Sequence, residues 1–226
     1  MDVGAKPAIQ QRSQATRDRL LDALDSLLRQ RRFEEIGIAD IARRAGVSTG
    51  TVYQRFQNRD AAISILLELY YRRVREWPAD PEGTAVPPPD LRGALERIAR
   101  NAWRQVAELG YLMRPAYLYS RLKPDLVGPT WARLERVAHG GYVELLARYR
   151  AEVVRDDPAQ TAGTMAAFIN LMALGRLLHP ESGTPFLRSR EAFVSDFVDF
   201  AYHYLTNRSV GPAAGRGPRR SRKEVQ

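Results

Sequence analysis

Apolar residues recur with a helical spacing through most of the chain. Between Thr16 and Leu28 the leucines share one face and charged residues fill the opposite face, as in an amphipathic helix. The same pattern predicts further helices at about 38–45, 49–56, 58–77, 91–109, 114–122, 129–150, 158–178 and 187–206. No segment alternates with a period of two, and no Asn-Gly or Asp-Gly hairpin signal occurs. The pattern therefore predicts an all-α fold.

Loops and biased ends divide this helical chain. Residues 78–90 contain five prolines and one glycine, so they are expected to form a loop. Residues 1–13 lack apolar periodicity and are expected to be a flexible arm. Residues 207–226 are rich in Gly, Pro and Arg, which predicts a disordered basic tail. These features leave an N-terminal domain at 14–60 and a larger helical domain at 61–206.

Composition narrows the class of protein. The chain has 226 residues, of which 44% are hydrophobic, so it can bury a full core. It has no uncharged apolar run long enough to span a membrane, and its first residues lack a signal-peptide pattern. It also contains no cysteine, which excludes disulfides and thiolate chemistry. We therefore expect a cytoplasmic protein without a membrane partner.

The positive charge lies at the two ends of the chain. Of the net charge of +9, residues 1–60 carry +3, residues 61–206 carry +1 and residues 207–226 carry +5. This distribution suits a polyanion-binding end attached to a neutral body. An arginine-rich composition that only keeps the protein in solution would give the same charge, so charge alone does not decide between the two.

The segment IADIARRAGVSTGTVYQRF, residues 38–56, has the pattern of a helix-turn-helix. Ala42 is small where the two short helices must cross, and Gly46 permits a left-handed turn between them. Ser48 can cap the second helix. These requirements are met together, which predicts a helix-turn-helix at about 37–57.

The second helix of this motif has two distinct faces. At 100° per residue, Val52 and Phe56 point inward together, and Gly50, Thr51 and Gln54 point outward. Glutamine can pair with adenine, and threonine can hydrogen-bond to a base or touch a thymine methyl group. Glycine adds no bulk, so this face could lie close to DNA. The alternative is an ordinary solvated helix face.

Residues at the edges of this face suit the phosphate backbone. Tyr53 and Arg55 flank the outward face, and Arg55 could instead reach a guanine. The next helix begins near Asn58 and Arg59, where free N–H groups and a cation offer a phosphate site. We count Ser48, at the start of the second helix, with the DNA-binding residues.

The run VSTGTVYQRF, followed by QNRDAAISILLE, resembles the N-terminal DNA-binding domain of TetR-family regulators over about 16–69. The resemblance implies a three-helix DNA-binding domain, joined by a long helix to a C-terminal helical domain for ligand binding and dimerisation. Family members usually have Thr where this chain has Gly37, which removes a hydroxyl that contacts phosphate. The implied DNA-binding residues are Thr49, Gly50, Thr51, Tyr53, Gln54 and Arg55, with Arg59 as a phosphate contact.

The resemblance also implies a small-molecule effector bound in the C-terminal domain. The aromatic and methionine residues of that domain are the candidates for a pocket, and ordinary core packing is the alternative for each of them. The candidates are Trp103, Tyr117, Trp131, Tyr142, Met165, Phe168 and Met172.

Two C-terminal helices are apolar enough to need a partner. Residues 158–178 are apolar around much of the helix, and residues 187–206 carry many large apolar side chains. We expect them to pair with their symmetry mates in a homodimer, as in the family, with burial inside one subunit as the alternative. The candidate interface residues are Ala166, Ala173, Phe193, Phe197, Ala201 and Tyr204.

Nothing in the sequence favours catalysis. His139, His179 and His203 lie far apart without a partnering motif, and no metal, nucleotide or nucleophile signature occurs. We expect no catalytic residue, no metal and no cofactor. The predicted function is a ligand-responsive repressor that binds a palindromic operator in double-stranded DNA as a homodimer. The alternatives are a nucleoid or division-site factor on the same fold, or an enzyme in the C-terminal domain.

Overall fold

The computed structural model describes residues 5–56, 60–78, 86–181, 183–184 and 189–207, and within these it leaves the side chains of 5–10, 130, 131 and 135 undescribed. The described residues contain helices and turns but no strand, so the predicted all-α fold is confirmed. The helices are α1 (Ala5–Leu28), α2 (Ile38–Ala45), α3 (Thr49–Phe56), α4 (Ala61–Arg75), α5 (Leu91–Leu122), α6 (Gly128–Arg148), α7 (Pro158–Leu178) and α9 (Arg190–Thr206), with single 3-10 turns η1 (Phe33–Glu35) and η2 (Pro124–Leu126).

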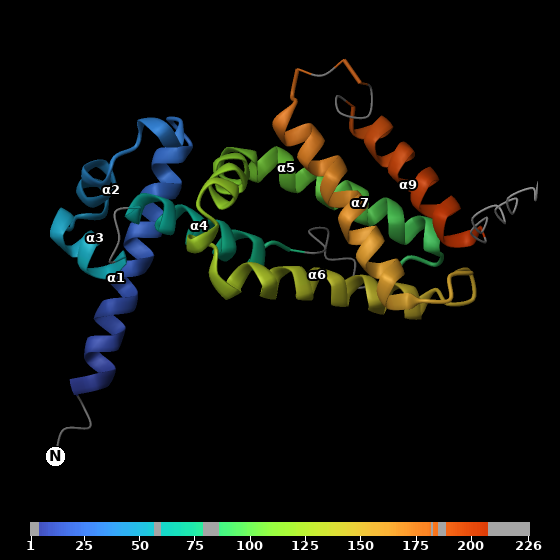
Figure 1. Ribbon diagram of the computed structural model, residues 1–226, viewed down its shortest axis with the longest axis horizontal. Coiled ribbons are helices and arrows are strands. Elements are labelled where there is room, and N and C mark those ends of the chain that lie inside the picture. The colour runs from blue at the N-terminus through green and yellow to red at the C-terminus, as the bar shows by residue number, and fades with distance from the viewer. Residues whose placement is uncertain (1–4, 57–59, 79–85, 182, 185–188, 208–226) are drawn as a thin grey trace, which may run out of the picture.

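The helices form two groups joined by α4. Helices α1, α2 and α3 lie at one end of the molecule, and α5, α6, α7 and α9 form the body at the other end (Figure 1). Each group has its own hydrophobic core, because each helix buries only its apolar stripe.

The N-terminal core is built mainly from α1, α2, α3 and the first part of α4. Leu24 of α1, Ile41 of α2, Val52 of α3 and Leu66 of α4 are all completely buried in it. The second half of α5 also contributes, since Leu112 and Ala116 belong to the same core. The N-terminal core therefore extends well past the predicted boundary at residue 60.

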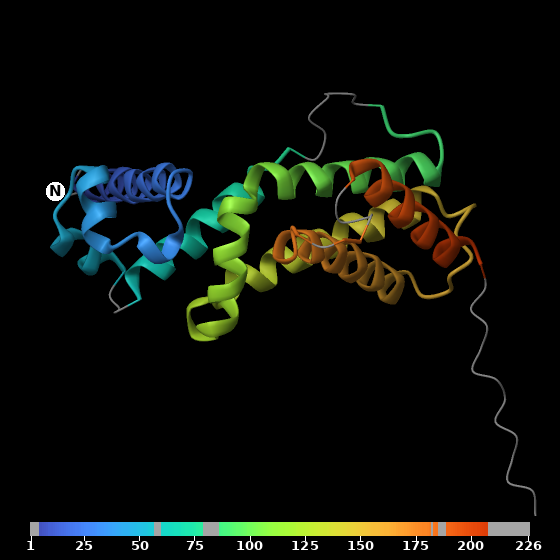
Figure 2. The same ribbon diagram turned by 90° about the horizontal axis from the view of Figure 1, so that it is seen from above.

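The C-terminal core collects the first half of α5, the end of α6, and helices α7 and α9. Leu95, Met165, Phe193 and Phe197 are among its buried members. Helix α5 thus serves two cores, one with each half. Figure 2 shows α5 changing direction along its length. Its second half contains Pro115, which removes a backbone hydrogen bond and is a common cause of helix bending.

Several predicted boundaries agree with the structure. Helix α7 spans residues 158–178 as predicted, and the Asp157 carboxylate caps it by accepting from the Gln160 N–H at 2.9 Å. The two helices predicted at 91–109 and 114–122 were wrong as separate elements, because α5 runs through Gly110 and Pro115 without a break.

Two helices begin at other residues than predicted. Residues 5–13 were predicted as part of a flexible arm, but they form the first turns of α1. Helix α4 begins after Asp60 rather than at Asn58, which lies outside the described residues. The predicted basic tail also lies outside them, apart from Asn207.

Helix α7 is long and apolar enough to cross a membrane by length and composition, and 33% of its most apolar stretch is buried within the chain. A core or interface helix of a water-soluble protein has the same composition, so the helix does not indicate a membrane protein. Leu171 is the large apolar side chain of α7 that lies exposed.

Candidate nucleic-acid interface

The turn between α2 and α3 depends on a glycine. Gly46 has φ 66° and ψ 38°, the left-handed conformation that side chains with a Cβ rarely adopt. The N–H of Val47 then donates to the Ala42 carbonyl at 3.0 Å, which satisfies an otherwise free carbonyl at the end of α2. The glycine predicted at this turn is confirmed in its role.

An aspartate closes the other end of α2. The N–H of Gly37 donates to the Asp40 carboxylate at 3.1 Å. This hydrogen bond, together with the nearby Arg31 and Arg43 guanidinium groups, holds the pKa of Asp40 below its usual value. Gly37 therefore takes part in the cap of α2 through its backbone N–H, without a side-chain hydroxyl.

Ser48 begins α3 as predicted. Its Oγ accepts a hydrogen bond from the Thr51 N–H at 3.2 Å and lies 2.9 Å from Thr51 Oγ1. This arrangement is an N-cap, which satisfies one of the free N–H groups of the first turn. It also gives both hydroxyl groups a partner inside the chain. Thr51 is half-buried rather than fully outward.

Helix α3 is anchored from one side only. Val52 has no exposed surface, and Phe56 is half-buried against the same N-terminal core. Full burial of a valine side chain contributes roughly 1.5–3 kcal/mol. Gln54 lies exposed on α3, and the Tyr53 side chain is 48% exposed. Gly50 and Gln54 therefore lie on the exposed side of α3 as predicted, whereas Thr51 is half-buried.

Gly50 is exposed in the first turn of α3, and the chain itself has little need of a glycine there. Its φ is not positive, and a Cβ added to it would meet only Ser48 Oγ, at an ordinary 3.7 Å. A glycine in a helix costs about 0.5–1 kcal/mol relative to alanine. The fold of the chain therefore does not require a glycine at this position.

Arg55 has a partner that the sequence did not reveal. Its guanidinium donates to the Ser13 Oγ of α1 at 2.7 Å and is half-buried. Ser13 was assigned to the flexible arm, so this contact could be found only once α1 was known to extend to Ala5. Arg59, the predicted phosphate contact, lies outside the described residues.

The predicted pocket residues lie in two separate places. Tyr142, Met165, Phe168 and Met172 belong to or pack against the C-terminal core, and burial raises the pKa of Tyr142. Trp103 joins them.

Trp103 lies between two partners in the C-terminal body. Its ring centroid is 5.5 Å from that of Phe193, and the Arg176 guanidinium carbon lies 3.6 Å from the Trp103 ring centroid. Tyr117 lies apart from this group on the second half of α5, beneath the Arg121 guanidinium. The side chain of Trp131 lies outside the described residues.

Two clefts occur elsewhere. One, of about 410 Å³, lies between α1, α4 and α5 and is lined by Arg29, Arg73, Trp77 and Glu108 among others. Another, of about 320 Å³, lies between α5 and α9. Neither is lined by a predicted pocket residue. Among the residues that the structure describes, no group of three or more His, Asp or Glu side chains is placed to hold a metal ion.

Half of the predicted dimer residues face the interior of the chain. Phe193, Phe197 and Ala201 are at most 1% exposed within the C-terminal core, so their assignment to an outward interface was wrong. They line the inner stripe of α9. Ala166, Ala173 and Tyr204 are half-buried.

The large apolar side chains that do lie exposed on these two helices are Leu171 of α7 and Phe200 of α9, each 67% exposed. Neither residue was among the predicted interface residues. Once Phe193 and Phe197 are assigned to the inward stripe of α9, a helical wheel places Phe200 at the edge of that stripe.

Comparisons with known proteins agree with this geometry. Residues 20–62, which include α2, α3 and the turn between them, match the family model described as "Bacterial regulatory proteins, tetR family". No curated protein sequence matches the chain.

Solved structures resemble the chain over most of its length. A putative TetR-family transcriptional regulator from Rhodococcus sp. is 22% identical, with a TM-score of 0.60, covering 85% of this chain and 99% of that one. The fatty acid degradation regulator FadR from Bacillus halodurans is 17% identical, with a TM-score of 0.58 and coverage of 85% and 97%.

A third structure is NalD, the secondary repressor of the MexAB-OprM multidrug efflux pump in Pseudomonas aeruginosa. It is 17% identical, with a TM-score of 0.54 and coverage of 87% and 100%. At these identities the likeness establishes the fold. The N-terminal domain of this chain is therefore a helix-turn-helix domain of the TetR family of bacterial regulatory proteins, and the chain as a whole has the all-α fold of that family's solved structures.

Proposed function

We propose that the protein is a transcriptional repressor that binds a palindromic operator as a homodimer and leaves it when a small molecule binds the C-terminal body. The observation that carries this proposal is the exposed face of α3, held rigidly from behind by Val52 and open in front at Gly50 and Gln54. A second helix of this motif, placed in the major groove, reads bases through such a face.

Each residue of this face has a defined role in the proposal. Gln54 is the base-reading residue, since its amide can pair with both the N6 and N7 edges of adenine. Gly50 lets α3 approach the bases closely, because no Cβ stands between the helix and the groove. Thr49 and Tyr53 lie exposed beside them and contact the sugar-phosphate backbone.

The exposed apolar side chains support a homodimer. Leu171 and Phe200 lie on α7 and α9, and the Phe168 ring meets the Phe200 ring edge-on at 6.0 Å. Apolar surface on two such helices is stabilised when a second copy covers it. A two-fold dimer would place two α3 helices about 34–36 Å apart, which is the spacing of successive major grooves.

The effector part of the proposal is supported by the division into two cores. A ligand that binds the C-terminal body more tightly in one arrangement would shift the spacing of the two α3 helices through α4 and α5. Two of the similar structures are a fatty acid degradation regulator and a repressor of a multidrug efflux pump. Both roles fit regulation by a small apolar molecule.

The substitution Gly50→Ala tests the reading helix without harming the fold. The site accepts a Cβ, so the free energy of unfolding should stay constant or rise by up to about 1 kcal/mol. Affinity for an operator selected from random duplexes should fall by about tenfold or more, because the methyl group holds α3 away from the bases. Chemical denaturation and fluorescence anisotropy measure the two effects.

Gly141→Ala is the matched control. Gly141 is an exposed glycine inside α6, and a Cβ there meets no atom within 4 Å. This variant should gain a similar stability and bind the operator as the wild type does. Equal operator affinity of Gly50→Ala and Gly141→Ala would contradict the proposed reading surface.

A further inference from the structure

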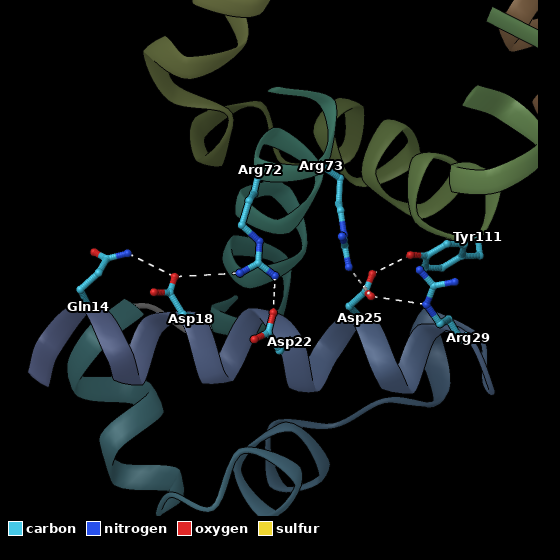
Figure 3. Close-up of polar contacts among 8 residues, drawn as sticks. All are labelled: Gln14, Asp18, Asp22, Asp25, Arg29, Arg72, Arg73 and Tyr111. Atoms are coloured by element: carbon cyan, nitrogen blue, oxygen red, sulfur yellow. Dashed lines mark hydrogen bonds and ion pairs between the residues drawn. The ribbon is translucent and has the colours of Figure 1, made fainter. Parts of the chain in front are cut away.

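Helix α1 presents a line of carboxylates to the end of α4. Arg72 of α4 lies 2.6 Å from Asp22 and 3.9 Å from Asp18, and Arg73 lies 2.7 Å from Asp25 (Figure 3). These ion pairs join two helices of the N-terminal domain. Most of the carboxylates are exposed, so their pairs are individually weak.

Asp25 differs from the other carboxylates because it also contacts α5, the helix that runs on into the C-terminal core. Only 7% of the residue is exposed, and the Tyr111 hydroxyl of α5 donates to its second oxygen at 2.6 Å. Arg29 donates to the carboxylate at 3.4 Å and lies over the Tyr111 ring, 4.6 Å from its centroid. One carboxylate thus holds side chains from α1, α4 and α5 (Figure 3).

Tyr111 lies where α5 passes from one core to the other. Trp103 still packs against the C-terminal core, whereas Leu112 is buried in the N-terminal core. The backbone of α5 is also weakest here, because Pro115 has no N–H to donate to the Tyr111 carbonyl one turn before it. The hydrogen bond to Asp25 therefore fixes α5 where its own ladder is incomplete.

The protonation states of Asp25 and Tyr111 favour the hydrogen bond between them. Burial acts to raise the pKa of Asp25, but the hydrogen bonds from Tyr111 and Arg73 outweigh it and leave that pKa below the usual value. Burial first, and then the hydrogen bond to Asp25, raises the pKa of Tyr111 to about 12. Near neutral pH the carboxylate is ionised and the phenol protonated, which gives a strong charge-assisted hydrogen bond.

We propose that Asp25 is a positioning residue, which sets the angle between the DNA-binding domain and the C-terminal body through Tyr111 and Arg73. In a dimer this angle sets the distance between the two α3 helices, and therefore the half-site spacing that the protein accepts. That consequence for DNA rests on the proposed function, whereas the positioning itself does not.

Tyr111→Phe is the sharpest test, since it removes one hydroxyl and keeps the ring beneath Arg29. Tyr119→Phe is the matched control, because Tyr119 also lies on the second half of α5 and packs on Phe33 at 5.0 Å. Among the described residues the Tyr119 hydroxyl has no hydrogen-bond partner. The two variants thus differ only in the bond to Asp25.

The first measurement needs no DNA. Amide hydrogen exchange around Tyr111 in α5 should become about tenfold faster in Tyr111→Phe and stay unchanged in Tyr119→Phe, since a bond to a charged group is lost in only one of them. Asp25→Asn should speed exchange in the same segment, because the neutral amide is a weaker acceptor and a weaker partner for Arg73. Equal exchange in Tyr111→Phe and Tyr119→Phe would overturn the proposal.

The second measurement uses the selected operator with its half-sites moved apart or together by one or two base pairs. Tyr111→Phe should lose discrimination between these spacings by about threefold or more, while Tyr119→Phe discriminates as the wild type does. A uniform loss at every spacing would overturn the positioning role in favour of simple stabilisation. If the wild type bound no duplex specifically, the proposed function would fail, and the exchange experiment would still decide on Asp25.

Discussion

The two core regions of this molecule differ in how far their large apolar side chains are covered. In the N-terminal domain the large apolar side chains of α1, α2, α3 and α4 are covered except for Tyr53, and the other exposed side chains are largely polar. In the C-terminal body Leu171 and Phe200 remain two-thirds exposed on adjacent helices, although the core beneath them is closed. The N-terminal region exposes little apolar surface to water, and its exposed polar face suits a charged, hydrated partner. The second region lacks an apolar cover, which suits another protein surface.

The largest expected effect comes from a charge placed on the exposed apolar face of α7 and α9. Phe200→Asp should raise the dimer dissociation constant by about a thousandfold, because the buried aromatic occurs twice in a two-fold interface. Sedimentation velocity at micromolar concentration measures the change. Leu122→Asp is the control, since Leu122 is 69% exposed on the far end of α5 and should leave the dimer intact. A wild-type protein that sediments as a monomer would refute the dimer.

The next largest effect concerns the polar face of α3. Gln54→Ala should cost about 1–3 kcal/mol of binding free energy, and only for duplexes that keep the preferred base pair at one position of each half-site. Competition binding with single-base-pair variants of the selected operator measures it. If the loss were the same for operator and random DNA, Gln54 would not be reading bases.

Ser48→Ala separates the support of α3 from its reading face. Loss of the N-cap should lower the free energy of unfolding by about 1 kcal/mol, because the Thr51 N–H loses its acceptor. Ser195→Ala on the exposed side of α9 removes a hydroxyl that caps no helix, and should not destabilise the protein. Thermal unfolding compares the two variants, and equal stability of both would contradict a stabilising role of the Ser48 N-cap.

The smallest expected effect is on the acid side of the stability profile. The folded-state pKa of Asp25 is lowered, so its contribution to stability is complete above the unfolded value of about 4 and is lost as pH falls below it. Arg73, Arg29 and Tyr111 are the groups that face it. In Asp25→Asn the free energy of unfolding should depend less steeply on pH in that range.

Asp22→Asn is the control for this titration, since the Asp22 side chain is 68% exposed and its pair with Arg72 is screened by solvent. Its acid profile should follow that of the wild type closely. Identical profiles for Asp25→Asn and the wild type would show that the contacts of Asp25 add no stability.

The parts of this molecule that the sequence predicts well are those with local causes. Gly46 needs a left-handed turn, Ser48 caps the helix that follows it, and Val52 repeats at helical spacing with Phe56. Each of these effects acts within a few residues, so the motif can be recognised without knowing the rest of the fold.

The parts that the sequence does not predict depend on distant contacts. Pro115 and Gly110 suggest a break in α5, but packing of its two halves on two cores keeps the helix continuous. The bond from Arg55 to Ser13 spans 42 residues, and that from Tyr111 to Asp25 spans 86. Periodicity shows that α9 has an apolar stripe, but not which of its edges a second core leaves uncovered.

Selection of duplexes by the full chain shows directly whether the protein binds a palindromic operator as a homodimer. Duplexes of random sequence are bound by the purified protein, recovered and sequenced through several rounds. A two-fold dimer is expected to select two inverted half-sites. Their centres should be separated by about one helical turn, 10–10.5 base pairs, or by a multiple of it. Enrichment of a single unrepeated half-site, or of no sequence at all, would contradict it.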